Sequence, residues 1–432
     1  MRHVLWLTIA AVVLLTILSC SDSTGPGGNA DVGGKYVVFA WNNLGMHCLN
    51  DTYDQAVILP PYNTLWVQVV HKGNPPEIVT SGLTVEYAID LNTYSYGKRD
   101  YGQFWDNAVK LFGPLLGITS LPRDIGLTGL GLTGTMSREA DHFIAEGIPV
   151  TPVNDTGAWN PYQVAVITVR GTGGAVLAQT KATVPVSDEI TCNKCHGQDA
   201  WGDILEEHDQ MHTTHLVDSI PVLCASCHGS PALGTTGPGT SGKYLSKAIH
   251  GAHASRGAVC YDCHPGPVTL CSRSVRHSTD DGNCTTCHGT IDQVASTIPA
   301  RIPWANEPAC VACHTGVAGV ATGFDLYRNA SGHGGVYCAA CHGSPHAMYP
   351  SRLAVDNYQP LQYQNFTGKV KAIGSCGTCH DSSRGEGVGG EFSEVHGGSG
   401  PERKIGCHVC HTVVPTETSK WPHAYEWKNS NG

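Results

Sequence analysis

A five-residue unit, Cys-x-x-Cys-His, occurs eight times between residues 192 and 411. Two thiols at this spacing can both reach the vinyl groups on one edge of a porphyrin, and the next imidazole can bind the iron, so the unit is the attachment signature of a c-type haem. We predict that haem is attached through Cys192, Cys195, Cys224, Cys227, Cys260, Cys263, Cys284, Cys287, Cys310, Cys313, Cys338, Cys341, Cys376, Cys379, Cys407 and Cys410. The first axial ligands of the irons are then His196, His228, His264, His288, His314, His342, His380 and His411.

Zinc is the alternative partner of such cysteine pairs. Cys-x-x-Cys occurs in zinc ribbons and also in thioredoxin-like redox sites. A structural zinc site would combine two pairs, without needing a histidine after each one. Because all eight pairs are followed by histidine, we predict eight covalently attached haem c groups containing iron.

Each iron keeps a second axial position, and the chain after residue 20 has fourteen further histidines to fill eight such positions. Histidine on both sides favours electron transfer, whereas an open position favours catalysis. The predicted second ligands are His208, His212, His250, His253, His333, His346, His396 and His423, with His277 and His215 in reserve. The first two, with His215, share one face if residues 205–216 are helical. His408, inside the eighth unit, is predicted to be a solvated spacer.

The N-terminus has the features of an export signal. Arg2 precedes an apolar run at residues 4–18 that is too short for an ordinary membrane-spanning helix. The run ends in Ile-Leu-Ser-Cys, which resembles a bacterial lipobox with Cys20 as the lipidated residue. Serine rather than aspartate at position 21 favours the outer membrane. Residues 21–34 are predicted to be a flexible tether.

Residues 35–187 are predicted to form an all-β sandwich. Apolar and β-branched runs at 35–41, 64–70, 83–89, 162–169 and 176–184 are separated by turn-forming residues. Residues 107–147 are predicted to be an irregular insertion with a short helix near 137–146. The Gly-Leu-Gly-Leu-Thr-Gly sequence at 129–134 matches the dinucleotide fingerprint, but no strand leads into it, so we interpret it as a loop.

Residues 188–432 are predicted to be a haem-packed multihaem cytochrome c domain with short helices and little regular structure. Successive units begin only 24 to 38 residues apart, which is too little chain to build a core of side chains around each cofactor. The porphyrins should therefore fill the interior. The fold class predicted for the whole chain is multidomain.

Charge and the remaining cysteines limit the other functions. A net charge of −10 argues against nucleic acid or an anionic membrane surface as the main partner. Met46, His47 and Cys48, with His71, contain ligand types that copper prefers, although ordinary buried neighbours are the simpler interpretation. Cys48 and Cys271 are the thiols left after haem attachment and lipidation, and they could pair in an oxidising compartment. No nucleophile, base and orienting group occur together, so we predict no catalytic residue.

The haem region resembles the outer-surface multihaem cytochromes of metal-respiring bacteria. The resemblance lies in residues 333–346, 420–423 and 185–189, and in the Ala-Trp-Asn-Asn-Leu-Gly-Met-His-Cys stretch at 40–48, which is similar to a β module found ahead of such haem domains. It implies electron transfer at the cell surface from another redox protein to a redox partner, a metal oxide or a soluble extracellular acceptor.

Two alternatives to the electron conduit stay open at this point. Some proteins of the resembling type polymerise into haem filaments, and His423 or His47 could then donate a ligand to a second copy. An octahaem nitrite or hydroxylamine oxidoreductase would often carry a lysine in place of one histidine of the units, and no such unit occurs here.

Overall fold

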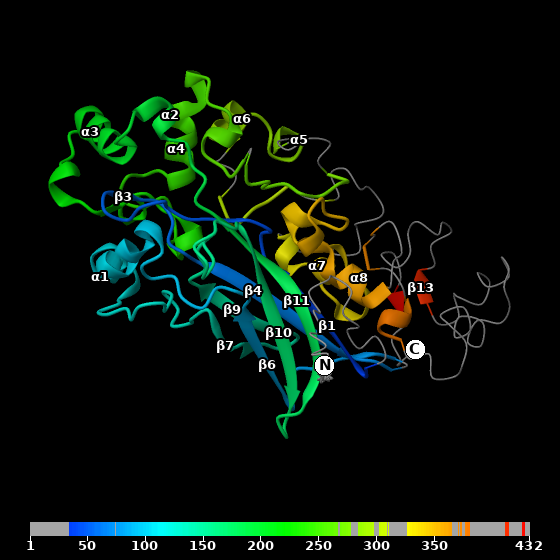
Figure 1. Cartoon of the computed structure of the whole chain (residues 1–432). Helices are drawn as coiled ribbons and strands as arrows, with labels where there is room; N and C mark the ends of the chain where they lie inside the picture. Colours follow the sequence, from blue (N-terminus) through cyan, green and yellow to red (C-terminus); the bar gives the residue numbers. More distant parts are fainter. Residues whose placement is uncertain are drawn as a thin grey trace, which may run out of the picture.

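The computed structural model describes residues 34–73, 75–266, 268–277, 284–297, 302–308, 310, 326–364, 370, 372–373, 376–380, 411–413 and 426–427. The predicted export signal and all but the last residue of the predicted tether lie outside these residues. As predicted, a β-rich region precedes a region with only short helices (Figure 1). Within the part of the chain that is described, no helix combines the length and the apolar character needed to cross a membrane.

Two five-stranded sheets form the sandwich. The first has the order β1 (Tyr36–Asn42), β4 (Asn63–His71), β9 (Phe143–Ile148), β8 (Ser137–Arg138), and β5 (Glu77–Ile78) also pairs with β4. The second has the order β2 (His47–Cys48), β11 (Val176–Ser187), β10 (Tyr162–Gly171), β6 (Leu83–Ile89), β7 (Thr133–Thr135). Neighbours are antiparallel except β2 and β11, which are parallel.

The five predicted strands are confirmed as β1, β4, β6, β10 and β11. Along each strand alternate side chains enter one buried core between the sheets, as the two-residue period of a strand requires. Val38, Val67, Val85, Ile167 and Val184 are fully buried there. The predicted loop at 129–134 is also found over residues 129–132, and only its last two residues, Thr133 and Gly134, join β7.

The helix predicted near residues 137–146 is wrong. That stretch forms β8 and β9 instead, and Phe143 and Ala145 alternate into the sandwich core. The helix of this insertion is α1 (Gly102–Leu116), whose Phe104, Ala108 and Leu111 are buried on one face. Helix α1 ends at Gly117, whose φ of 72° favours glycine.

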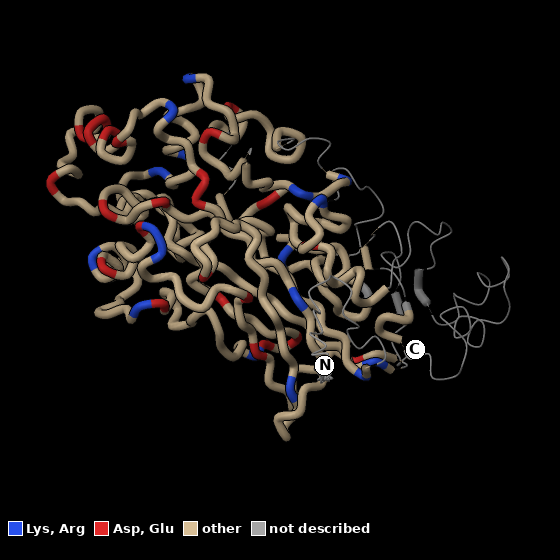
Figure 2. Tube along the Cα trace, viewed as in Figure 1, with Lys and Arg blue, Asp and Glu red and all other residues tan. Residues whose placement is uncertain are grey.

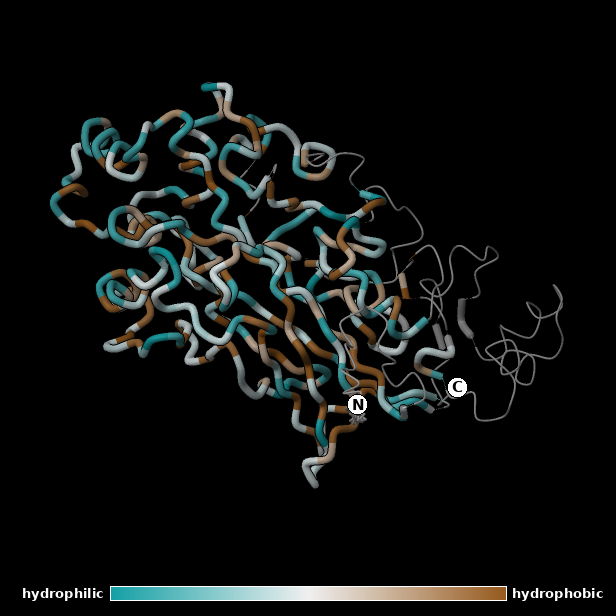
Figure 3. Tube along the Cα trace, in the orientation of Figure 1, coloured by the Kyte–Doolittle hydropathy of each residue, from teal (hydrophilic) through white to brown (hydrophobic). Residues whose placement is uncertain are grey.

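The outer face of β1 is buried as well. Val37, Phe39 and Trp41 pack with residues of the haem-unit region, among them Tyr337, in a second hydrophobic cluster. Two helices supply the cover, α7 (Cys338–His342) against β1 and α8 (Tyr358–Gln364) against β11 (Figure 1). Figure 3 shows the hydrophobic residues concentrated in the sandwich, with a more hydrophilic and mixed colouring over the short helices. The first sheet therefore lies between the second sheet and the sixth unit.

The remaining helices and strands lie beside the other units or contain part of one. They are α2 (Asn193–His196), α3 (Ala200–His212), α4 (Leu245–His253), α5 (Cys284–His288), α6 (Ile291–Thr297), β3 (Ala56–Val57), β12 (Val222–Leu223), β13 (His411–Val413) and β14 (Glu426–Trp427). β3 pairs with β12 in parallel, so the strand just before the second unit is hydrogen-bonded to the β region. Trp201 and Leu205 of α3 pack on Ala56 in a third cluster.

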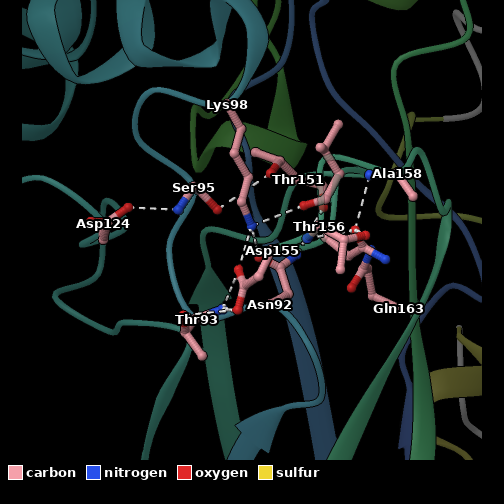
Figure 4. A network of polar contacts seen from close by, with 12 residues as sticks. Asn92, Thr93, Ser95, Lys98, Asp124, Thr151, Asp155, Thr156, Ala158 and Gln163 are labelled. Atoms are coloured by element: carbon pink, nitrogen blue, oxygen red, sulfur yellow. Dashed lines mark hydrogen bonds and ion pairs between the residues drawn. The ribbon is translucent and has the colours of Figure 1, made fainter.

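A buried lysine stabilises the loops at one end of the sandwich. Lys98 is 5% exposed, and its Nζ donates to Asn92 Oδ1 at 2.9 Å, to the Val153 carbonyl at 3.1 Å and to Asp155 Oδ1 at 2.8 Å (Figure 4). Burial raises the pKa of Asp155, but hydrogen bonds from Lys98 and Thr93 outweigh it, so this pKa lies below its ordinary value.

Replacing Asp155 by asparagine is expected to lower the free energy of unfolding by about 2 kcal/mol at neutral pH, since Lys98 stays buried without its countercharge. The depressed pKa of Asp155 means that the carboxylate stabilises the fold above its ordinary pKa of 3.8 and loses this effect as the pH falls. Denaturant unfolding at pH 7 and below pH 4 measures this. The difference in free energy of unfolding between the two proteins should shrink as the pH falls, and a difference that grows would contradict the assignment.

Candidate functional site

Each described unit forms one tight helical turn. In the first three units the histidine N–H donates to the carbonyl of the first cysteine, over 3.0, 3.0 and 2.9 Å. The fourth and sixth units are the helices α5 and α7, and the seventh begins with a 3₁₀ turn at Cys376–Thr378. Residues four apart in a helical turn lie on the same face. The turn therefore holds the first cysteine and the histidine on one side, as attachment to a single porphyrin requires.

Four of these histidines face a second histidine from elsewhere in the chain. The ring centres are 6.2 Å apart for His196 and His253, 6.3 Å for His228 and His208, 6.1 Å for His264 and His250, and 6.3 Å for His288 and His346. A metal–imidazole bond is about 2 Å long, and the ring centre lies about 1 Å behind the nitrogen, so two imidazoles on one ion have centres about 6 Å apart. All four pairs match the separation of two axial ligands on one iron.

Hydrogen bonds at Nδ1 orient most of the eight rings in these four pairs. In six of them Nδ1 has an oxygen partner: Asp203 Oδ2 for His196 (2.8 Å), Ser241 Oγ for His228 (2.9 Å), Thr214 Oγ1 for His208 (2.9 Å), the Ser246 carbonyl for His250 (2.7 Å), the Ile249 carbonyl for His253 (2.7 Å) and the Leu44 carbonyl for His346 (2.9 Å). A hydrogen bond at Nδ1 fixes the tautomer that keeps the lone pair on Nε2 for a metal. In each of these six rings Nε2 is therefore the nitrogen that can bind a metal.

Buried donors beside the sixth unit fit a haem as well. Among the described residues, Trp41 Nε1 and Trp66 Nε1 are buried without a hydrogen-bond partner, and both rings lie against Tyr337, the residue before Cys338. An unpaired buried N–H is costly, so a bound acceptor is expected at this place. The propionates of a haem held by the sixth unit would supply such an acceptor. Together with the paired histidines, these donors fit haem c.

The thiols of neighbouring units lie close enough to interact electrostatically. Cys263 of the third unit interacts with Cys192 and Cys195 of the first, and Cys260 of the third with Cys284 of the fourth. The same holds for Cys287 with Cys310, for Cys310 with Cys338, and for Cys341 with Cys379. Each unit from the third to the sixth therefore adjoins the next one along the chain.

The other predicted ligands are placed differently. His212 is exposed, and its ring centre is 4.9 Å from that of His208. His215 and His277 are exposed. His333 is described only in its backbone, and His396 and His423 lie outside the described residues, as does nearly all of the fifth and eighth units. For the irons of the fifth to eighth units, the choice of second histidine stays a prediction.

The group His196, Asp203 and Glu207 brings three metal-binding side chains within 4.8 Å of one another. Because the His196 ring lies opposite His253 and its Nδ1 is hydrogen-bonded to Asp203, we interpret Asp203 as the partner that orients an iron ligand. Sequence reasoning missed Asp203; the signal was a carboxylate seven residues after the unit's histidine, at the start of a helix. Within the described residues, the group around His196 is the one cluster of three metal-binding side chains, and it does not include His47. His47 Nε2 lies 3.0 Å from Asn43 Oδ1 instead, so no contact supports the copper hypothesis.

Replacing Asp203 by asparagine is expected to raise the reduction potential of the first unit's iron. A carboxylate that accepts the Nδ1 proton makes the imidazole a stronger donor and stabilises the ferric state. A tenfold loss of the preference for the ferric state would raise the potential by about 59 mV for one electron. Because Asp203 is partly exposed, we expect an increase smaller than this. Redox titration followed by EPR measures it, with Glu207→Gln as the control. Equal potentials in the two variants would contradict the role.

Comparison with known protein families agrees with this geometry. The model of "cytochrome c7 and related cytochrome c" matches residues 207–289, and that of "cytochrome c554 and c-prime" matches residues 292–343. No curated protein and no solved structure matches the chain. The two matches cover five of the repeated units, the second to the sixth, and their families suggest covalently bound haem and electron transfer. The two family matches thus indicate a multihaem c-type cytochrome.

Proposed function

We propose that the chain carries eight haem c groups, each with two histidine ligands, and conducts electrons from a donor at the cell envelope to an acceptor outside the cell. The observation that carries this proposal is the four facing histidine pairs at ring-centre distances of 6.1 to 6.3 Å. Bound haem iron supplies one-electron chemistry, and a second histidine closes the position that a substrate would need. Closed irons favour conduction over catalysis.

The contacts between units support one order of electron transfer. Helix α3 joins the second and first units, since His208 faces His228 while Asp203 binds His196. Asp262 joins the first and third units by accepting from Lys194 Nζ at 2.6 Å. The thiol contacts then continue from the third unit to the seventh. The proposed order is second, first, third, fourth, fifth, sixth, seventh, with the eighth beyond them.

The proposed location is the outer membrane or the cell surface, with a lipid on Cys20 and residues 21–34 as the tether. The proposed partners are redox proteins, with a metal oxide or a soluble extracellular compound as the final acceptor. Acidic residues are concentrated on α3 (Figure 2), namely Asp203, Glu206, Glu207 and Asp209. A negative surface near the second unit would favour a cationic partner there.

No described contact favours the filament or the oxidoreductase over this conduit. His47 is 7% exposed and bonded to Asn43, so it is not presented to a second copy. His423, the other proposed donor to a neighbouring copy, lies outside the described residues.

The test uses the exported holoprotein. Its mass and haem absorbance should give eight haems per chain, and the reduced protein should be rapidly reoxidised by a soluble ferric chelate without turnover of nitrite or hydroxylamine. Fewer haems would contradict the count. Sustained turnover of nitrite or hydroxylamine would replace conduction by catalysis.

A further inference from the structure

Two cysteines of the described chain lie outside the repeated units, and the fold brings their segments together. Cys48 is in β2, at the edge of the second sheet, and Cys271 follows the third unit. The two are far apart in sequence and belong to different regions. Nothing in haem attachment uses either thiol.

The segment around Cys271 is fixed to the sandwich by side chains. The Glu189 carboxylate accepts from the Val268 and Thr269 N–H groups, at 3.1 and 2.6 Å. The Tyr162 hydroxyl accepts from the Leu270 N–H at 2.7 Å. Cys271 therefore follows three residues that are each hydrogen-bonded to β10 or to the segment that directly follows β11.

Two neighbours of Cys48, one in the adjacent strand and one in its own chain segment, contact the segment that contains Cys271. Ser187 is the register partner of Cys48 in the β2–β11 pair, and its Oγ lies 2.9 Å from Thr269 Oγ1. Three residues before Cys48, the Gly45 carbonyl accepts from Arg273 Nη1 at 2.7 Å, and the same Nη1 lies 3.3 Å from the Cys271 carbonyl. Burial raises the pKa of Cys48, and the charge of Cys271 raises it further, which places the two thiols near one another.

We propose that Cys48 and Cys271 form a disulfide that joins β2 to the segment after the third unit. Both thiols lose their hydrogens and one S–S bond forms. The two electrons and two protons pass to the disulfide of a thiol–disulfide oxidoreductase of the export compartment, which becomes a dithiol. Such compartments keep disulfides oxidised.

The bond would hold the β region against the haem region at a point where polar contacts already meet. A link between residues so distant in sequence restricts the unfolded chain strongly. It would also remove the two remaining free thiols from a protein that exchanges electrons, so that neither is open to oxidation. This gives the β region a covalent part in holding the units together.

The test is thiol labelling of the exported, haem-loaded chain. The protein is unfolded without reductant, treated with iodoacetamide, digested and analysed by mass spectrometry. We expect a cross-linked peptide pair containing Cys48 and Cys271, with under half of either thiol labelled, and full labelling of both after reduction. Labelling of half or more of either thiol without reduction overturns the proposal.

Variants separate the bond from other causes of low labelling. In Cys271→Ser the remaining Cys48 should be labelled fully without reductant. In the double variant Cys48→Ser, Cys271→Ser, reductant should leave the unfolding midpoint unchanged, whereas it should lower the midpoint of the unchanged protein. Equal midpoints of the unchanged protein with and without reductant would also count against the bond.

Discussion

Replacing His208 by alanine is expected to leave one iron per chain high-spin and open to carbon monoxide, whereas replacing His212 by alanine is expected to change neither property. Both histidines lie on α3, four residues apart. His208 faces His228 of the second unit at 6.3 Å, with Thr214 beside its Nδ1, while His212 lies exposed against His208. Only the first variant should therefore lose an iron ligand.

The comparison is made on the two exported holoproteins, by ferric EPR and by absorbance after reduction under carbon monoxide. The high-spin signal of the His208 variant should equal one iron per chain. A carbon monoxide complex in the His212 variant, or none in the His208 variant, would contradict the assignment. Equal unfolding midpoints would exclude a general loss of structure.

Replacing Arg273 by methionine is expected to lower the free energy of unfolding by about 3 to 5 kcal/mol, the range typical for one partner of a buried pair. The Arg273 side chain is fully buried, with Nε 2.7 Å from Asp356 Oδ2 and Nη2 3.1 Å from Oδ1. Asp356 also accepts from Thr183 and Ser351 at 2.6 Å each. The pair thus ties three segments together, and Asp356 would be left buried with its charge uncompensated.

Denaturant unfolding of the holoprotein, followed by far-ultraviolet circular dichroism, gives the change in free energy. Arg276→Met is the control, because Arg276 is exposed three residues further on, and it should change the free energy of unfolding by less than about 0.5 kcal/mol. If both variants were equally stable, the Arg273–Asp356 pair would not hold the two regions together.

The local signals in the sequence predicted well. Strands β4 and β10 are apolar runs between turn-forming residues, and such runs fold as their period indicates. The helical prediction at residues 137–146 was wrong because that stretch pairs with β4 through β9. The paired residues are about 80 positions apart in sequence, and this pairing outweighs the local preference. Helix α1 was missed although Phe104, Ala108 and Leu111 have helical spacing and Gly117 follows.

Pairings between distant residues could not be predicted from the sequence. His196 and His253, or His288 and His346, are almost sixty residues apart, and nothing local indicates which histidine faces which unit. The same is true of Arg273 and Asp356. Counting histidines showed that enough ligands exist. Only the packing of α3, α4 and the turn at Pro345–Ala347 against the units shows which histidine faces which unit.

The interior of the haem-unit region is only in part as predicted. The sequence suggested that porphyrin alone would fill it, yet Tyr337, Ala340 and Tyr363 join Phe39 and Trp41 in an aliphatic and aromatic cluster. The sixth unit is thus held by the outer face of a sheet. We infer that the β region serves as a platform for the units. The strand pattern predicted that Phe39 and Trp41 lie in a strand, but it did not predict what they pack against.

The most direct test of the central claim is a spin count of the ferric holoprotein by EPR, set against its haem content. The account predicts low-spin signals from bis-histidine iron that sum to the full haem content, with no absorbance change under carbon monoxide after reduction. A high-spin signal from one iron or more per chain would contradict it.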